Sequence, residues 1–267
     1  MMDRPHIIYN QFTKKYVCWL KIMEKNGIQS ETVLTADQFL GPYTIEKTNL
    51  RPLNMSAGDF DLAVAPDGKA YYYFERVHSE TICADLTADY TDVTGYYSTH
   101  FPHPAPPYVR EATAHFYRNG KHYLVTSGTT GYFPNPSEVA IADTWHGPYT
   151  VLGNPHPGDD SCTSYHSQIS SVLKVEGKKD LYIAIADRWC PEDMDIPYAF
   201  YREMFEFIFQ GKADKIPELI QKYQIVPPAP DEHRNTSIAD YVWLPFRFDG
   251  DMAYLDWKDE WKIEDYE

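Results

Sequence analysis

Arg110–Gly128 reads Arg-Glu-Ala-Thr-Ala-His-Phe-Tyr-Arg-Asn-Gly-Lys-His-Tyr-Leu-Val-Thr-Ser-Gly. It contains two runs of β-forming residues, Ala114–Tyr117 and Lys121–Ser127, on either side of Asn119-Gly120. An Asn-Gly pair between two such runs predicts a β-hairpin, because both residues tolerate the positive φ of a tight turn. Glu111 lies just before the first of these strands. Considered alone, a glutamate at a strand end is an ordinary solvated residue.

The same strand–turn–strand unit occurs four times along the chain. The first strands of the units begin at Asp3, Asp59, Glu111 and Gln168, at steps of 56 (59 − 3), 52 (111 − 59) and 57 (168 − 111) residues. Such a period is typical of the four-stranded blade of a β-propeller. A second repeat agrees with this period. Ala36–Thr44 returns 106 residues later (142 − 36) as Ala142–Thr150, and both copies end in Gly-Pro-Tyr-Thr. We therefore predict an all-β propeller, and we expect residues 1–267 to form a single domain.

The rhythm of strands breaks after Trp189. Ile196–Phe209 and Pro217–Tyr223 carry apolar residues at helical spacing, which predicts two short helices. We expect residues 191–236 to be a small helical insertion in the propeller. Strands resume at Tyr241 and would supply the outer strands of the fourth blade.

Composition limits the classes of partner. A net charge of −15 argues against nucleic acid and anionic membranes, since either would require a basic face. Aromatic residues make up 15% of the chain and favour a surface on which sugar rings stack. The ten histidines show no dense metal-ligand spacing, and neither a phosphate-binding glycine loop nor a G-x-S-x-G motif occurs, so we expect no metal and no cofactor.

The sequence also bears on the compartment. No signal peptide opens it, and no apolar run approaches the ~18 residues of a membrane span. The four cysteines are widely spaced without a C-x-x-C pair, which favours reduced, mostly buried thiols over disulfides. We therefore expect a cytoplasmic protein.

Several motifs follow one another along the chain: Arg4-Pro5-His6-Ile7-Ile8-Tyr9-Asn10, Gly58-Asp59-Phe60, Arg110-Glu111-Ala112, Ser167-Gln168 and Tyr241-Val242-Trp243-Leu244-Pro245. Taken as a set, these motifs resemble the glycoside hydrolase family 43 type of five-bladed propeller, and most of all its exo-β-1,3-galactanase branch. The likeness covers nearly the whole chain outside the insertion. It implies five blades where this chain supplies four units, so that the first blade is lacking. The chain then closes as a four-bladed ring, is part of a longer protein, or is completed by self-association or a partner chain.

The resemblance implies an exo-acting, inverting glycosidase that cleaves β-galactosidic linkages in a galactan-type oligosaccharide or polysaccharide. Glu111 matches the general acid, and Asp59 matches the aspartate whose charge raises the pKa of that acid. Gln168 stands where this branch has a glutamine in place of the usual aspartate base. An amide is a poor base, so the resemblance implies that Gln168 orients water or acts through an unusual tautomer. Asp3 replaces a substrate-contacting glutamate of the relatives and is one methylene shorter.

Other residues are candidates for binding substrate or for replacing the missing base. Thr129 is a predicted contact, and Trp145, Trp189, Tyr241 and Trp243 are candidates to stack on sugar, although core packing explains each aromatic residue equally well. The pair Asp159-Asp160 lies in a polar stretch before Gln168. It could supply the missing carboxylate base, or it could form an ordinary surface turn.

Two other functions stay open from the sequence. A propeller that has lost turnover together with its first blade would bind carbohydrate without hydrolysing it. The same machinery also fits a β-xylosidase or an α-arabinofuranosidase. A panel of aryl β-galactoside, β-xyloside and α-arabinofuranoside with β-1,3-galactobiose distinguishes these alternatives.

Overall fold

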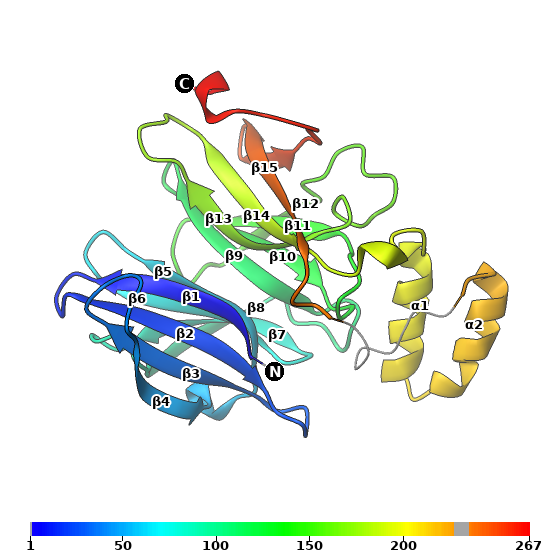
Figure 1. Ribbon diagram of the computed structural model, residues 1–267, viewed down its shortest axis with the longest axis horizontal. Helices are drawn as coiled ribbons and strands as arrows, with labels where there is room; N and C mark the ends of the chain where they lie inside the picture. The colour runs from blue at the N-terminus through cyan, green and yellow to red at the C-terminus, as the bar shows by residue number, and fades with distance from the viewer. Residues whose placement is uncertain (1, 227–234) are drawn as a thin grey trace.

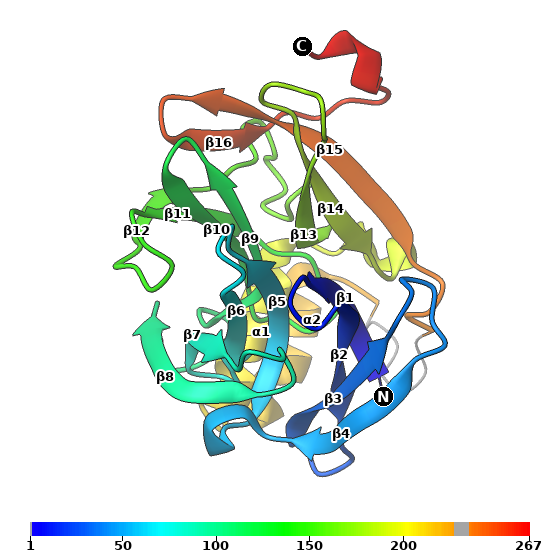
Figure 2. The same cartoon turned by 90° about the vertical axis from the view of Figure 1, so that its left-hand side faces the viewer.

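A computed structural model describes residues 2–226 and 235–267, and these residues form four antiparallel sheets of four strands each. In each sheet, strands that follow one another in the sequence are neighbours. Figure 1 labels the strands, and Figure 2 shows the first strand of each sheet near the centre and the fourth strand at the periphery. This is the blade arrangement of a β-propeller, so the predicted fold class is confirmed, with four blades.

The strands have the following bounds. The first blade consists of β1 (Met2–Asn10), β2 (Lys15–Met23), β3 (Gln29–Ala36) and β4 (Thr44–Leu50). The second consists of β5 (Ala57–Val64), β6 (Ala70–Arg76), β7 (Glu80–Leu86) and β8 (Val93–His100). The third consists of β9 (Arg110–Arg118), β10 (Lys121–Gly128), β11 (Ser137–Ala142) and β12 (Thr150–Gly153). The fourth consists of β13 (Gln168–Lys174), β14 (Tyr182–Arg188), β15 (Asp240–Asp249) and β16 (Met252–Leu255).

Turn residues in the sequence are placed where the chain reverses direction. Asn119 and Gly120 have φ of 49° and 83° and join β9 to β10, as the Asn-Gly signal predicts. The two copies of the nine-residue repeat join the third strand to the fourth in the first and third blades, β3 to β4 and β11 to β12. Both repeats therefore mark the same structural unit.

Neighbouring blades pack face to face through apolar clusters. Between the first and second blades the cluster includes Trp19, Phe60 and Tyr72, all fully buried. A smaller cluster around Tyr73 and Leu124 joins the second blade to the third. The largest cluster joins the third blade to the fourth along the length of β9, β10, β14 and β15. Burying such a side chain stabilises the fold by about 1.5–3 kcal/mol, so these three interfaces hold the ring together.

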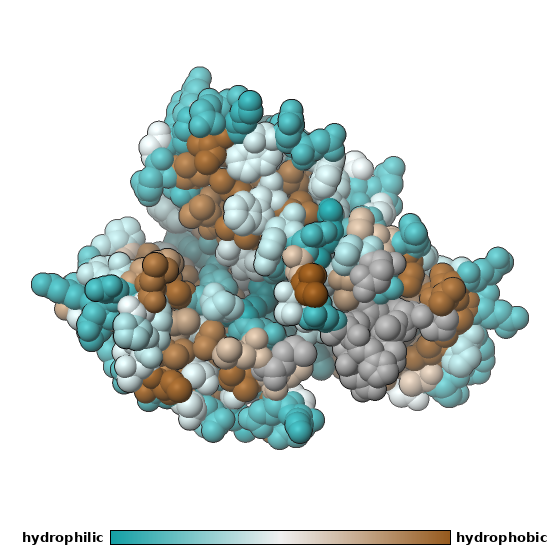
Figure 3. Space-filling model, viewed as in Figure 1, coloured by the Kyte–Doolittle hydropathy of each residue, from teal (hydrophilic) through white to brown (hydrophobic). Residues whose placement is uncertain are grey.

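Among the described residues no such cluster joins the fourth blade to the first. Two sheet faces therefore remain uncovered by a neighbouring blade, and we call the gap between them the seam. Their exposed apolar side chains are Ile7, Tyr9 and Ile45 on the first blade and Leu173, Tyr241 and Trp243 on the fourth. Figure 3 shows the molecule hollowed between these two blades. Near the axis the blades do meet, because Arg4 on β1 reaches Gln168 on β13.

The helices α1 (Tyr198–Phe209) and α2 (Ile216–Tyr223) lie to one side of the propeller in Figure 1, where the sequence predicts helices. They share a small core that includes Phe200 and Leu219. One face of α1 docks on the third blade's loop, where Tyr201 stacks on Phe133 at 3.7 Å between ring centroids. Both helices fall within residues 191–236, of which 227–234 lie outside the described residues.

Four short 3-10 helices complete the described elements: Pro52–Asn54, Pro191–Asp193, Ala213–Lys215 and Ile263–Asp265. No described helix is both long and apolar enough to cross a membrane. No disulfide links the four cysteines, all of which lie in the described residues; Cys18 and Cys83 are buried, Cys190 is half-buried and Cys162 is exposed.

Candidate active site

The four innermost strands each carry a β-bulge where a candidate site residue lies. Pairing is interrupted between Asp3 and His6 on β1 and between Ala57 and Phe60 on β5. On β9 it is interrupted after Glu111, and on β13 after Ile169. A bulge adds a residue to one strand and re-aims the side chains around it. Each blade thus uses the same local irregularity to present polar side chains near the axis.

The bulge residues show why this sequence accepts the irregularity. Arg4 and Ala112 have φ of 49° and 51°, in the left-handed region that regular strands do not use. Pro5 lacks a backbone N–H, and a bulge is one of the few places in a sheet where the missing donor is tolerated. Gly58 lies in the bulge of β5, where a Cβ would come within 2.2 Å of the Glu75 Oε2 atom.

A network of polar contacts joins the site residues of all four blades. Arg4 donates from Nη2 to Gln168 Oε1 at 2.8 Å and pairs with Asp59 Oδ2 at 3.0 Å. Lys21, on β2, donates from Nζ to Asp59 Oδ1 at 2.5 Å. Gln168 donates from Nε2 to Glu111 Oε1 at 3.3 Å. Asp59, Glu111 and Gln168, predicted from the sequence as a set, therefore converge on one end of the propeller axis.

Asp59 is the charged centre of this network. Burial alone would raise the pKa of its carboxyl group, but the charges and hydrogen bonds of Arg4 and Lys21 outweigh burial and hold the pKa below its ordinary range. Burial would likewise lower the pKa of Lys21, but the carboxylate of Asp59 raises it. The pair is therefore ionised at neutral pH.

Glu111 has the opposite balance. Burial raises the pKa of its carboxyl group well above the ordinary value, and the negative charges of Asp59 and Glu75 raise it further. The positive charges of Lys21 and Arg4 oppose this rise without cancelling it. Glu111 is therefore a carboxylic acid that keeps its proton near neutrality, which is the property of a general acid.

Glu75 is a neighbour that the sequence analysis missed. It lies near the end of β6, is 3% exposed, and accepts the backbone N–H of His78 at 2.7 Å. Burial raises its pKa to about 7. The available signal was a charged residue directly after the apolar run Tyr71–Phe74, since such a position in a buried strand seldom carries an unpaired charge. The same signal applies to Lys21 after Val17–Leu20.

The amide of Gln168 is held by contacts on both sides. Its oxygen accepts from Arg4, and its nitrogen donates to Ser127 Oγ at 2.7 Å as well as to Glu111. Because the guanidinium has only donors, these contacts fix which end of the amide is oxygen. The side chain is 5% exposed.

The predicted substrate contacts fall into three groups. Asp3 borders the network, with Oδ2 at 3.8 Å from Lys21 Nζ. Tyr241 and Trp243 lie on the seam face of β15 and are 64% and 53% exposed, with ring centroids 6.5 Å apart. Thr129 is buried, and its hydroxyl donates to the carbonyl of Val109 at 3.0 Å, so it holds the chain before β9.

The remaining aromatic candidates pack against protein. Trp189 is half-buried, with the ring of Tyr132 edge-on at 5.7 Å. Trp145 stacks on Tyr71 at 4.3 Å and on His115 at 4.9 Å, inside the contact between the second and third blades. Trp145 therefore contributes to the core.

Asp159 is tied into its own loop. Its carboxylate accepts the hydroxyl of Ser161 and the backbone N–H groups of Thr163 at 2.8 Å and Tyr165 at 3.2 Å. Asp160 beside it is exposed. Asp159 and Asp160 therefore form a surface turn, which is one of the two interpretations of this pair from the sequence. In the part of the chain that the structure describes, no group of three or more His, Cys, Asp or Glu side chains is placed to hold a metal ion.

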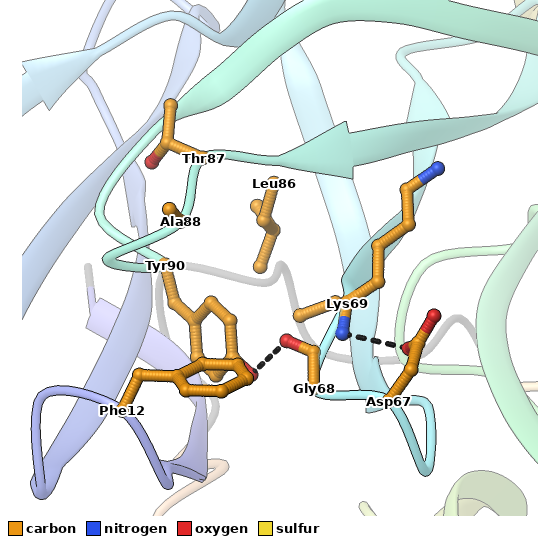
Figure 4. A pocket seen from close by; sticks show the side chains of 9 residues that line it. Phe12, Asp67, Gly68, Lys69, Leu86, Thr87, Ala88 and Tyr90 are labelled. Atoms are coloured by element: carbon orange, nitrogen blue, oxygen red, sulfur yellow. Dashed lines mark hydrogen bonds between the residues drawn. The ribbon is translucent and has the colours of Figure 1, made fainter.

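A small cavity of about 290 Å³ lies apart from this network, beside the turns that follow β1 and β5 (Figure 4). Phe12 and Gly68 form one side of it, and the hydroxyl of Tyr90 donates to the carbonyl of Gly68 at 2.5 Å. The inner strands run from the polar network toward these turns, so the cavity is at the opposite end of the propeller from the candidate site.

Comparisons with known proteins identify the family of the chain and solved structures that are similar to it. The model of the family described as glycosyl hydrolases family 43 matches residues 5–183. No curated protein matches the chain in sequence. A solved family 43 β-1,3-galactosidase is 25% identical, with a TM-score of 0.74, over 100% of this chain and 47% of its own.

Two further solved structures share the fold. A second family 43 β-1,3-galactosidase, with galactodeoxynojirimycin, is 24% identical over 98% of this chain and 77% of its own, with a TM-score of 0.74. An exo-β-1,3-galactanase from Phanerochaete chrysosporium is 21% identical over 96% of this chain and 48% of its own, with a TM-score of 0.69. The chain thus spans about half the length of the first and third of these proteins.

Proposed function

Because the chain belongs to glycosyl hydrolase family 43, we propose that it is an exo-acting, inverting glycosidase that cleaves β-galactosidic linkages of the galactan type. The observation that carries the proposal is Glu111, whose half-buried carboxyl group keeps its proton because desolvation and the negative charge of Asp59 both raise its pKa. The choice of galactoside is supported by the solved β-1,3-galactosidase that is 25% identical to this chain.

In the proposed reaction Glu111 donates its proton to the oxygen of the leaving group while the bond from that oxygen to the anomeric carbon breaks. A water molecule attacks the opposite face of the sugar ring and inverts the configuration. Gln168 donates a hydrogen bond to Glu111 Oε1 and so fixes the orientation of the acid. General acid catalysis of this kind contributes about 10²–10⁴-fold to the rate.

Asp59 acts in this proposal through its charge rather than through a proton. It stays ionised because Arg4 and Lys21 hold it, and its negative charge favours the protonated form of Glu111. The negative charge of Asp59 also stabilises the positive charge that develops on the sugar ring in the transition state.

The seam favours a second candidate function, a propeller that binds carbohydrate without turnover. Tyr241 and Trp243 expose their rings on the seam face of β15, where a sugar can stack, and the open gap admits water beside the site. Catalysis requires a closed, preorganised site more than binding does. A β-xylosidase or α-arabinofuranosidase would use the same carboxyl groups.

A panel of glycosides distinguishes these functions. We expect turnover of β-1,3-galactobiose and an aryl β-galactoside that exceeds turnover of the aryl β-xyloside and α-arabinofuranoside. Glu111→Gln serves as the control for contaminating activity. Preference for a pentoside would replace the galactosidase assignment, and calorimetric binding of galactobiose without hydrolysis would establish the binding function instead.

A further inference from the structure

The proposed reaction needs a base for the attacking water, and the contacts of Gln168 make this residue unsuitable. Its amide oxygen accepts a hydrogen bond from the Arg4 guanidinium. An imidic tautomer would place a proton on that oxygen, facing a cation that has no acceptor. The contact therefore stabilises the ordinary amide, in which neither end takes up a proton at neutral pH.

A carboxylate lies on the strand beside Gln168. Asp187, on β14, is the cross-strand partner of Gln168 and in turn of Tyr241 on β15. Residues directly opposite one another in an antiparallel pair point to the same face, with Cβ atoms about 4.5–5.5 Å apart. The exposed ring of Tyr241 shows that this face is the seam face. Asp187 is half-buried there.

The surroundings of Asp187 suit a base. Burial raises the pKa of its carboxyl group, while the positive charge of Arg4 and a hydrogen bond from Ser170 oppose that rise. A carboxylate with a raised pKa accepts a proton from water more readily than an ordinary one. Arg4 thus contacts Gln168 and Asp59 directly and acts electrostatically on Asp187.

We propose that Asp187 is the general base of hydrolysis and that Gln168 is a positioning residue between this base and the acid Glu111. The inference rests on the proposed glycosidase function. Asp187 takes one proton from water as the water oxygen bonds to the anomeric carbon. The bond to the leaving oxygen breaks, and that oxygen receives the proton of Glu111. Afterwards Asp187 gives a proton to solvent and Glu111 regains one, so both return to their starting forms.

The test compares Asp187→Ala and Asp187→Asn with wild type on 2,4-dinitrophenyl β-galactoside, whose leaving group needs no protonation. We expect kcat to fall about 10²–10⁴-fold in both variants. Azide, a nucleophile that needs no base, should restore turnover of Asp187→Ala and yield the galactosyl azide of inverted configuration, detected by proton NMR. A merely structural role of Asp187 would not produce such rescue. Thermal unfolding of the nearly isosteric Asp187→Asn verifies that the variant is folded.

Matched variants make the result decisive. Asp249→Asn changes an exposed aspartate at the far end of the same sheet and should leave kcat unchanged. Asp3→Ala and Gln168→Ala receive the same azide treatment. Two results would overturn the base assignment and leave the proposed function intact. One is azide rescue of Asp3→Ala or Gln168→Ala instead of Asp187→Ala, and the other is an Asp187→Ala variant with kcat within threefold of wild type. Absence of wild-type turnover on every glycoside of the panel overturns the proposed function and the base assignment with it.

Discussion

At the scale of single residues, the site is built from two carboxyl groups held in opposite protonation states. Asp59 is ionised because two cations contact it, whereas Glu111 keeps its proton because burial and neighbouring negative charge disfavour its ionised form. Separated pKa values of this kind identify acid and base roles in many enzymes. Both residues carry a carboxyl group, and it is their partners in the fold that give the two groups different protonation states.

Glu111→Gln should separate proton donation from sugar binding. The amide keeps the shape of the side chain but carries no transferable proton, so kcat on a glycoside with a poor leaving group should fall about 10²–10⁴-fold. A dinitrophenyl glycoside should be largely spared. Steady-state kinetics on both substrates check this expectation. Equal losses on both would mean that Glu111 positions the sugar.

Asp59→Asn should shift the pH dependence. The substitution removes the negative charge that raises the pKa of Glu111 and leaves the positive charges of Arg4 and Lys21 uncompensated. Both effects lower the pKa of Glu111, so the limb of the pH–rate profile on which activity is lost as pH rises should move to lower pH. A limb that stays in place would show that burial alone sets the pKa of the acid.

The same variant should also be less stable. The pKa of Asp59 is lower in the folded state than in the unfolded state, so its contribution to stability is present above the unfolded pKa of about 3.9 and is lost as pH falls toward the folded pKa. Removing one partner of a buried ion pair costs about 3–5 kcal/mol. Urea unfolding at pH 7 measures this loss, and the difference from wild type should shrink at acidic pH.

The residues that the sequence identified are those that stand in motifs. Glu111, Asp59 and Gln168 head repeated units, so their positions follow from the period. Lys21, Glu75 and Asp187 stand in the interior or at the ends of second strands, where no repeat distinguishes a site charge from any other. Thr129 and Trp145 show the reverse problem, because side chains suited to bind sugar are equally suited to support a loop or fill a core.

At the scale of elements, the sequence predicted what is local. The Asn-Gly turn, the repeated Gly-Pro-Tyr segments and the helical spacing near 196–223 each depend on neighbouring residues, and each is found in the structure. The bulges are different. They depend on the pairing of two strands, and no short motif specifies them, although they bring the site residues together.

Gly58→Ala tests how closely the bulge of β5 approaches β6. Its Cβ would come within 2.2 Å of Glu75 Oε2, and the buried carboxylate would have to move. We expect a loss of about 1–3 kcal/mol in the free energy of unfolding. The double variant Gly58→Ala/Glu75→Ala removes the clashing atom and serves as the control in a double-mutant cycle. Additive losses would show that the glycine is needed for another reason.

At the scale of the whole molecule, the four units and their order follow from the sequence, but the seam does not. Periodicity counts blades without specifying whether the last one packs on the first. The structure shows that three interfaces carry apolar clusters. Among the described residues no such cluster joins the fourth pair of faces, and Arg4 and Gln168 connect these two blades near the axis. The seam therefore lies beside the site, and apolar side chains are exposed on both of its faces.

Those surfaces lead to a prediction about the 267-residue chain in solution. Exposed apolar faces of this kind promote association, so we expect self-association that increases with protein concentration. Trp243→Lys places a charge on the seam and should shift the chain toward monomer in sedimentation velocity experiments. Val151→Lys, on the outer strand β12 of the third blade, makes the same charge change at a site that is 46% exposed and away from the seam, and should have no such effect.

The seam faces do not drive association if the wild-type chain is monomeric at every concentration, or if both substitutions have equal effects. If Trp243→Lys yields a monomer that still hydrolyses the galactoside, the four blades suffice for the chemistry and the seam faces serve assembly alone.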